Sequence, residues 1–279
     1  MDRRTVTLIE YPDLVQGTEE WHAARRGIVT ASTVGRLLSV TKPGAQEYEC
    51  PECAAPAGEP CISKRGGAVI KTLHSERATV AADNAATALA IVKPATGDDA
   101  RNLTLLLTSE RIAGWTEPTF ISADMERGHR DEPIARDLYS EHYAQATEVG
   151  FMRLEMRGYT LGYSPDGTVG DGGLIEVKSR RPKSHLATIL ADAVPVENMA
   201  QLMCGLLVSG RKWIDYISIC TGLPLWVKRV YPDPVWFDAI VQAVVLFELN
   251  AAHMIRTYTA RTTGLPMTER ILDLEEMIL

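Results

Sequence analysis

Alternating apolar and polar residues predict the strands of this chain. The run Leu174 to Lys178 follows the turn at Gly172-Gly173, and it places Glu176 and Lys178 on one face and Ile175 and Val177 on the other. The runs 213–220 and 225–231 alternate in the same way and pair across the turn at 221–224, and 5–9 is a further short strand. The sequence therefore predicts a sheet that displays a carboxylate and an ammonium side by side.

Helical spacing of apolar residues predicts the remaining elements. Thr18 caps a first helix that ends near Gly27, and the segment 78–94 is rich in alanine and compatible with a helix. In the segment 122–143, Glu132 stands at the start of the helix before Pro133, and four apolar side chains share one face: Ile134, Ala135, Leu138 and Tyr139. Further helices are expected at 34–38, 102–112, 196–207 and 236–257, with a helical or frayed tail to Leu279.

The turn Ser164-Pro165-Asp166-Gly167 comes directly before the strand that carries Glu176. A hairpin would bring Asp166 alongside Glu176, and two carboxylates beside Lys178 suit a hard divalent cation with oxygen ligands. The alternative is an ordinary surface turn followed by a charged strand edge, because such turns favour these residue types. Glu132 has two interpretations as well: a carboxylate that stabilises the start of its helix, or a third acidic residue directed at the metal.

Composition narrows the class of protein only moderately. The chain has 279 residues with 46% hydrophobic and 23% charged residues, as expected for a globular protein of one or two domains. We expect a cytoplasmic protein, because no apolar segment follows the N-terminus and no run approaches the roughly 18 apolar residues of a membrane span. The net charge of −7 does not suggest a nucleic-acid binder, but it does not exclude a nuclease with carboxylates at its metal site.

Cysteine spacing predicts a zinc site in the segment 42–79. Cys50, Cys53, Cys61 and His74 follow the pattern C-x2-C-x7-C-x12-H, which suits one tetrahedral zinc ion. So polar a segment cannot bury a core, and we expect the metal to fold it. The alternative is three free cysteines in a loop. The other two cysteines, Cys204 and Cys220, fall in apolar elements, where packing explains them.

Basic residues gather at several places, each with two interpretations. In the cysteine-rich segment they either contact phosphate or form a solvated surface: Lys64, Arg65, Lys71 and Arg77. A second group follows the central strand: Lys178, Arg180, Arg181 and Lys183. Arg25 and Ser32 flank a glycine turn and either receive a phosphate together with a helix N-terminus, or are an exposed arginine and an ordinary cap.

Five short motifs in one order resemble the phage lambda exonuclease and YqaJ-like viral recombinase family of the PD-(D/E)xK nuclease superfamily. The resemblance covers roughly residues 17–250 apart from the cysteine-rich segment. That segment in turn resembles a small zinc finger of phage and actinobacterial proteins, which ends in His-x-x-Arg. The five motifs are Trp21-His22 with Arg25-x-Gly27-x-x-Thr30-Ala31-Ser32; Gly128 with Glu132 and Ala135-Arg136; Ser164 to Gly167; Glu176-Val177-Lys178; and Met199-Ala200-Gln201.

The resemblance implies a fold and a set of roles. The fold is an α/β (α+β) core of the restriction-endonuclease type, with a central mixed sheet flanked by helices; the nuclease domain would span 1–41 and 80–279, interrupted by a zinc module at 42–79. Lys178 would orient or activate the attacking water, Gln201 would position the lysine or the substrate, and Arg25 with Ser32 would hold a 5′-phosphate. The ligands of Mg²⁺ or Mn²⁺ would be Glu132, Asp166, Glu176 and the Val177 carbonyl.

The resemblance also implies an activity and partners. These are 5′→3′ digestion of double-stranded DNA ends for phage-type recombination, a ring-shaped homotrimer and a single-strand annealing protein. The zinc segment departs from the family pattern, and we expect it to add a contact to DNA or to a partner. Two alternatives remain: a non-catalytic zinc-finger accessory protein of recombination, and a nuclease of the same superfamily that prefers other ends or structures. The complete set of acidic residues with its lysine favours an enzyme.

Overall fold

The computed structural model describes residues 6–84, 90–118 and 122–270. The chain forms two compact units, the first from Met1–Leu38 and Pro94–Leu279 and the second from Ser39–Lys93. The cysteine-rich segment 42–79 belongs to the second unit. Of the predicted tail, residues 271–279 lie outside the described residues, and 263–270 form no helix.

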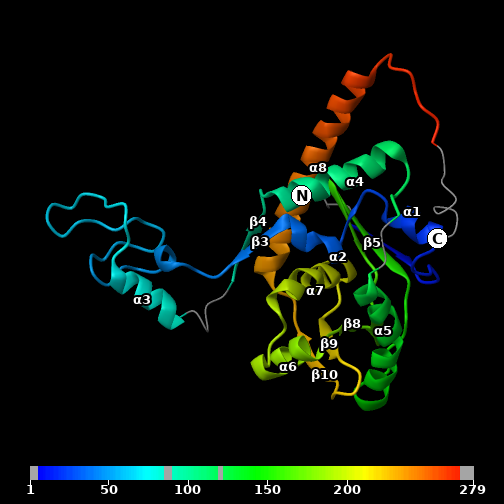
Figure 1. Cartoon of the computed structure of the whole chain (residues 1–279), viewed down its shortest axis with the longest axis horizontal. Coiled ribbons are helices and arrows are strands. Elements are labelled where there is room, and N and C mark those ends of the chain that lie inside the picture. Colours follow the sequence, from blue (N-terminus) through cyan, green and yellow to red (C-terminus); the bar gives the residue numbers. More distant parts are fainter. Residues whose placement is uncertain (1–5, 85–89, 119–121, 271–279) are drawn as a thin grey trace. The chain divides into compact units, whose positions relative to one another are not determined.

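Two four-stranded sheets, each with both parallel and antiparallel neighbours, support the first unit (Figure 1). One has the order β1-β5-β6-β2, with β2 parallel to β6; the other has the order β10-β9-β8-β7, with β8 parallel to β9. The predicted α/β class with mixed sheets is confirmed, although the strands divide between two sheets. The strands are β1 (Thr7–Tyr11), β2 (Val29–Thr30), β5 (Phe151–Met156), β6 (Tyr159–Tyr163), β7 (Gly167–Val169), β8 (Gly173–Ser179), β9 (Trp213–Ile219) and β10 (Trp226–Val230).

Helices cover both faces of the sheet that contains β8. Ile175 and Val177 pack with Ala135 and Tyr139 of α5, whereas Glu176 faces α7. The alternation read from the sequence therefore sets which residues reach the core and which reach the opposite side of the strand. The helices are α1 (Glu19–Arg25), α2 (Ala31–Val34), α4 (Asp98–Ala113), α5 (Ala123–His142), α6 (Pro182–Ala191), α7 (Val196–Ser209) and α8 (Pro234–Thr262), and a 3-10 turn η1 (Gly35–Leu37) follows α2.

Helix α5 corrects two of the predictions from sequence. It begins at Ala123, so Glu132 and Pro133 lie inside the helix and not at its start. Ala135 and Tyr139 are buried, but Ile134 and Leu138 are exposed, so the four residues do not share one buried face. The buried stripe consists of Asp131, Ala135 and Tyr139 at four-residue spacing.

Helix α8 is long and apolar enough to cross a membrane by length and composition, with a mean hydropathy of 1.5 over an 18-residue window. The expectation that no segment reaches this level is therefore too strict. Length and composition do not distinguish a membrane span from a core helix, and α8 packs against α4 and α7. Trp236, Ile240, Val244 and Phe247 form part of its buried side.

The second unit has little regular structure. Strands β3 (Leu38–Thr41) and β4 (Ile91–Pro94) pair where the chain enters and leaves it, and between them lie a 3-10 turn η2 (Ala45–Glu47) and helix α3 (Ser75–Asn84). The expected helix over 78–94 is therefore only partly correct, because 91–94 is a strand and 85–89 lie outside the described residues.

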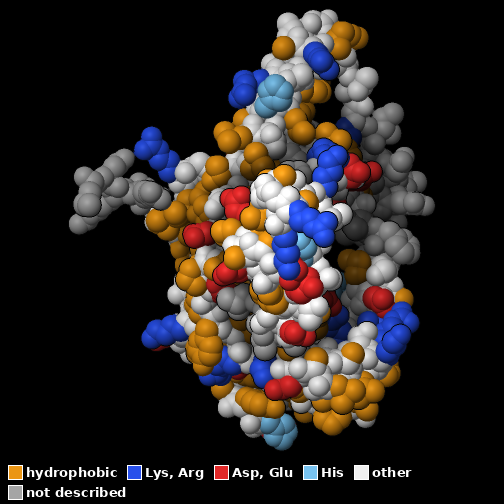
Figure 2. All heavy atoms as spheres, turned by 90° about the vertical axis from the view of Figure 1, so that its left-hand side faces the viewer, with side chains coloured by type: hydrophobic (Ala, Val, Ile, Leu, Met, Phe, Trp, Pro, Cys, Tyr) orange, Lys and Arg blue, Asp and Glu red, His pale blue; other side chains and the backbone are white. Residues whose placement is uncertain are grey.

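On the face drawn in Figure 2, Lys and Arg side chains are scattered among acidic and apolar ones and form no single basic patch.

Candidate active site and metal centre

Strand β8 and helix α7 bring Glu176, Lys178 and Gln201 together. Lys178 Nζ donates to Glu176 Oε1 over 2.8 Å and to Gln201 Oε1 over 2.9 Å, and Gln201 Nε2 donates to Glu176 Oε1. Tyr163 adds a hydrogen bond from its hydroxyl to Glu176 Oε2 at 3.2 Å. Burial lowers the pKa of Lys178, but the charges of Glu176 and Asp166 outweigh it and leave the pKa raised. The ammonium group is thus held charged beside the carboxylate.

The predicted hairpin forms and places Asp166 against β8. β7 and β8 are antiparallel, and the backbone N–H of Val177 donates to Asp166 Oδ2 over 2.6 Å. Burial, together with the negative charges of Glu176 and Glu132, raises the pKa of Asp166 well above its usual range. Three carboxylates that repel one another in one place are an arrangement that a divalent cation would relieve.

Glu132 reaches the same cavity from the middle of α5. Burial raises its pKa; the positive charge of Arg136 opposes this, and Glu176 adds to it. Arg136 Nη1 lies 3.3 Å from Glu132 Oε1 and also donates to the backbone carbonyl of Asp166. Its Nη2 lies 3.0 Å from Glu148 Oε2. Arg136 therefore connects the helix-borne carboxylate to the turn that carries Asp166.

Arg25 and Ser32 lie on another wall of the cavity, together with Trp21 and Thr30. Arg25 Nη2 contacts Thr30 Oγ1 and Ser32 Oγ, both at 3.4 Å, and its guanidinium lies 3.8 Å from the centre of the Trp21 ring. Burial lowers the pKa of Arg25 to about 10, although the charge of Glu110 raises it, so the group stays charged at neutral pH. From the sequence, Arg25 was either part of a phosphate pocket or an ordinary exposed arginine. Its side chain is half-buried and stacks on an indole, which is unlike an ordinary exposed arginine.

One cavity of about 300 Å³ is lined by every residue that was predicted from the sequence to act in catalysis, substrate binding or binding of the divalent metal. Carboxylate oxygens are the ligands that Mg²⁺ and Mn²⁺ prefer, so this donor set fits such an ion. The described residues around the cavity are Gln16, Trp21, Arg25, Thr30, Ala31, Ser32, Met125, Gly128, His129, Glu132, Tyr163, Ser164, Asp166, Glu176, Val177, Lys178 and Gln201.

Several residues of the site received no role from the sequence. Three of them belong to the five motifs of the family resemblance, which was the only sequence signal for them: Trp21, Ser164 and Arg136. No sequence signal pointed to Tyr163 or His129. The four basic residues that begin at Lys178, near the end of β8, do not act as a group. Arg180 binds Tyr216 and Asn198, and Arg181 pairs with Asp124. Only Lys178 of the four lines the cavity.

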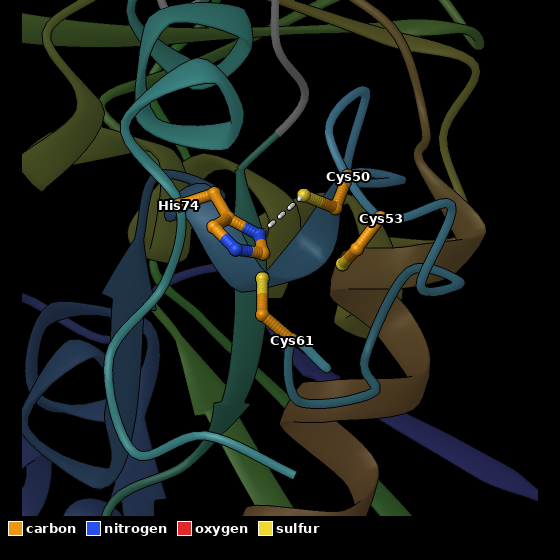
Figure 3. A group of neighbouring side chains, drawn as sticks. All are labelled: Cys50, Cys53, Cys61 and His74. Atoms are coloured by element: carbon orange, nitrogen blue, oxygen red, sulfur yellow. Dashed lines mark hydrogen bonds between the residues drawn. The ribbon is translucent and has the colours of Figure 1, made fainter. Parts of the chain in front are cut away.

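The second unit gathers the four predicted zinc ligands. The side chains of Cys50, Cys53, Cys61 and His74 point toward a common centre (Figure 3), and their ligand atoms all lie within 4.8 Å of one another. Zinc bonds of about 2.0–2.3 Å in a tetrahedron would separate the ligand atoms by about 3.5–3.8 Å. Cys50 Sγ and His74 Nδ1 are already 3.4 Å apart. The donor set and its spacing therefore fit zinc with small adjustments.

Hydrogen bonds prepare two of the thiols for a metal. The backbone N–H of Ile62 is the main cause that lowers the pKa of Cys53, to about 6. Burial raises the pKa of Cys61, but the His74 N–H and the Arg77 guanidinium outweigh it and leave the pKa lowered. At Cys50, burial prevails and the pKa is raised.

Arg77 is fully buried beside this cluster. Its guanidinium donates to Cys61 Sγ at 3.5 Å and to four backbone carbonyl oxygens. These carbonyls belong to Gln46, Tyr48, Pro56 and Glu59, at distances from 2.7 to 3.0 Å. Arg77 thus joins the loops around the cysteines to helix α3. The local basic excess read from the sequence is correspondingly smaller, because Arg77 is internal and Lys64 pairs with Glu52.

Comparison with known proteins defines the class first. Residues 15–94 match a family described as "Putative DNA-binding phage zinc finger domain", and residues 73–212 match the YqaJ-like viral recombinase domain. The second match spans half of the chain. The fold is that of a phage-type nuclease, and the chain belongs to the YqaJ-like viral recombinase family.

Solved structures agree with this assignment. The crystal structure of the alkaline exonuclease LHK-Exo from Laribacter hongkongensis is similar, with 25% identity and a TM-score of 0.62 over 89% of this chain and 100% of that one. LHK-Exo in complex with dAMP matches at 24% identity, with the same TM-score and the same coverage of each chain. The predicted nuclease fold is confirmed. None of the curated proteins compared with this chain matches it.

Proposed function

We propose that this protein is a divalent-metal-dependent exonuclease that digests double-stranded DNA from its ends during phage-type recombination. The observation that carries the proposal is one cavity that joins the cluster around Glu176 and Lys178 to the pocket around Arg25. Family membership and the likeness to an alkaline exonuclease support the reaction class. A module that only binds DNA has no use for carboxylates that face phosphates.

Asp166, Glu176 and Glu132, with the backbone carbonyl of Val177, would hold Mg²⁺ or Mn²⁺. Such an ion supplies a nucleophilic water at neutral pH and neutralises charge on the phosphate oxygens. Lys178 would hold the water through its one remaining N–H donor, because Glu176 and Gln201 already engage the other two. Gln201 positions Lys178 and Glu176 together from α7.

The pocket of Arg25 and Ser32 would bind the 5′-phosphate of the terminal nucleotide. A guanidinium and hydroxyl groups recognise phosphate oxygens through charge-assisted hydrogen bonds. Since the carboxylates line the same cavity, a nucleotide held by its 5′-phosphate places its next phosphodiester near them. Removal of nucleotides from the 5′ end, in the 5′→3′ direction, follows from this arrangement.

The zinc module and the partners complete the proposal. Cys50, Cys53, Cys61 and His74 would bind a structural Zn²⁺, in a module at 42–79 inserted between the nuclease segments 1–41 and 80–279. By resemblance to the family, the protein would act in the cytoplasm of a host cell as a homotrimeric ring with a single-strand annealing protein. Within the described residues, the one apolar helix of membrane length packs in the first unit.

Digestion of linear duplex DNA with and without a 5′-phosphate, in Mg²⁺ and in EDTA, tests the proposal. We expect Mg²⁺-dependent loss from phosphorylated ends, abolished in Lys178→Ala and retained in the control Lys183→Ala, whose side chain is exposed. Cleavage that ignores the 5′-phosphate would indicate a nuclease with another substrate preference. DNA binding without any cleavage would indicate the accessory protein and refute the enzyme.

A further inference from the structure

Trp21 touches both halves of the candidate site. It lies on α1 one turn before Arg25, and its ring supports the Arg25 guanidinium at 3.8 Å. Its indole Nε1 donates to Ser164 Oγ over 3.1 Å. Ser164 precedes Asp166 by two residues, with Pro165 between them. One buried side chain therefore connects the phosphate pocket to the turn that carries a metal-binding carboxylate.

Arg25 can readily exchange its present hydroxyl contacts for contacts to a phosphate. Its two contacts to the hydroxyls of Thr30 and Ser32 are long, at 3.4 Å, whereas a guanidinium binds phosphate oxygens at about 2.7–2.9 Å. A bound phosphate would pull the Arg25 guanidinium toward itself and so change the contact between the guanidinium and the Trp21 ring. The ring in turn holds Ser164, and the stiff Pro165 limits how far Asp166 can move independently.

We propose that Trp21 is a positioning residue that couples the bound 5′-phosphate to the placement of Asp166, so that phosphorylated ends are cleaved faster once bound. This inference rests on the proposed function and deepens it. The ring face and the Nε1–H have separate tasks: the face supports Arg25 and affects binding of the end, and the N–H holds the Asp166 turn and affects the rate of cleavage.

Conservative variants separate the two tasks. Trp21→Phe keeps an aromatic face and removes the Nε1–H, and Ser164→Ala removes the same hydrogen bond from its other end. On 5′-phosphorylated duplex in Mg²⁺, each variant should lower kcat about fivefold and leave KM nearly unchanged, as expected for one hydrogen bond. The double variant should lose no more than either single one. Trp21→Leu should raise KM as well, because Arg25 loses its support.

Trp236→Phe is the matched control, because it removes the same atoms from a buried tryptophan of α8 outside the cavity. It should leave both kcat and the preference for phosphorylated over hydroxyl ends unchanged. The preference ratio distinguishes positioning from general loss of stability: it should fall about fivefold in Trp21→Phe and Ser164→Ala, with cleavage of hydroxyl ends retained.

Each of the other possible outcomes refutes the coupling. If Trp21→Phe keeps the wild-type kcat and preference, the coupling is refuted while the exonuclease stands. Additive losses in the double variant would refute it too, because the two residues would then act separately. If the wild-type protein has no preference for phosphorylated ends, in cleavage or in binding with Ca²⁺ in place of Mg²⁺, the coupling and the phosphate pocket both fail, and metal-dependent cleavage is unaffected. No cleavage and no such binding preference refute the proposed function and the coupling alike.

Discussion

The guanidinium of Arg136 donates a hydrogen bond to the backbone carbonyl oxygen of Asp166. The same side chain pairs with Glu132 on its own helix and is only 12% exposed. A single cation thereby connects the carboxylate of Glu132 to the backbone of the turn that carries Asp166. Because the cation is mostly buried and charged, its hydrogen bonds are of the stronger kind, worth about 1.5–3 kcal/mol each.

Replacement of Arg136 should therefore cost both stability and activity. We expect Arg136→Met to lower the free energy of unfolding by about 2–3 kcal/mol and kcat by about tenfold or more. Arg136→Lys should not rescue kcat, since an ammonium cannot span Glu132 and the Asp166 carbonyl with the same fixed geometry. Denaturant unfolding and duplex digestion measure the two effects. Arg101→Met, at an exposed pair with Asp98, is the control and should change neither.

Gly128 is a place where stability and function should oppose each other. It lies inside α5 and lines the cavity, and an added Cβ would meet no atom within 4 Å. Gly128→Ala should stabilise the helix by about 0.5–1 kcal/mol, because alanine loses less backbone entropy. The methyl group would point into the space that the DNA strand needs, so we expect kcat/KM on duplex DNA to fall about tenfold.

Thermal unfolding and digestion of the same preparation test this pair of effects. Thr259→Ala on the exposed side of α8 supplies a similar gain in helix propensity away from the cavity and should leave digestion unchanged. A Gly128→Ala protein that is both more stable and fully active would show that the strand does not approach α5 at this residue.

The candidate site was largely predictable from sequence because β8 follows the simplest rule. Period-two alternation placed Glu176 and Lys178 on one face, and a short turn placed Asp166 beside them. The continuation of α5 through Pro133 was not predictable in this way. Pro133 looked like a helix start, but it only removes the hydrogen bond to the carbonyl of His129, and His129 is exposed, so water can serve that carbonyl.

Features that depend on contacts between residues far apart in the chain could not be predicted from the sequence. The segment 91–94 has few local signals and becomes a strand because β3 pairs with it. Arg77 looked like one of several basic surface residues, yet it is buried by carbonyl oxygens from two separate loops. Arg136 and Trp21 gain their roles from contacts to residues 30 and 143 positions away, which no local pattern encodes.

Arg77 should prove as necessary to the second unit as a cysteine ligand. Arg77→Met would leave carbonyl oxygens of both loops without their donor, and each buried unsatisfied group costs about 1–3 kcal/mol. We expect Arg77→Met, and also Arg77→Lys, to release zinc far more readily in competition with a zinc-sensitive dye. Arg65→Met changes an exposed arginine of the same unit and should retain zinc like the wild type. Equal retention in all three variants would contradict a structural role for Arg77.

Zinc removal should unfold the second unit and spare the first. The buried cluster around the site consists of Cys50, Ala55 and Cys61, with Cys53 and Ile70 packed against it, which is too little apolar surface to hold a fold. A zinc-selective chelator in Mg²⁺ buffer should abolish amide hydrogen-exchange protection in α3, while β8 and α7 keep theirs. Cys53→Ser should reproduce this pattern without chelator, and Cys220→Ser, in the first unit, should not. Protection of α3 that survives the loss of zinc would show that the loops and Arg77 hold the unit together without metal.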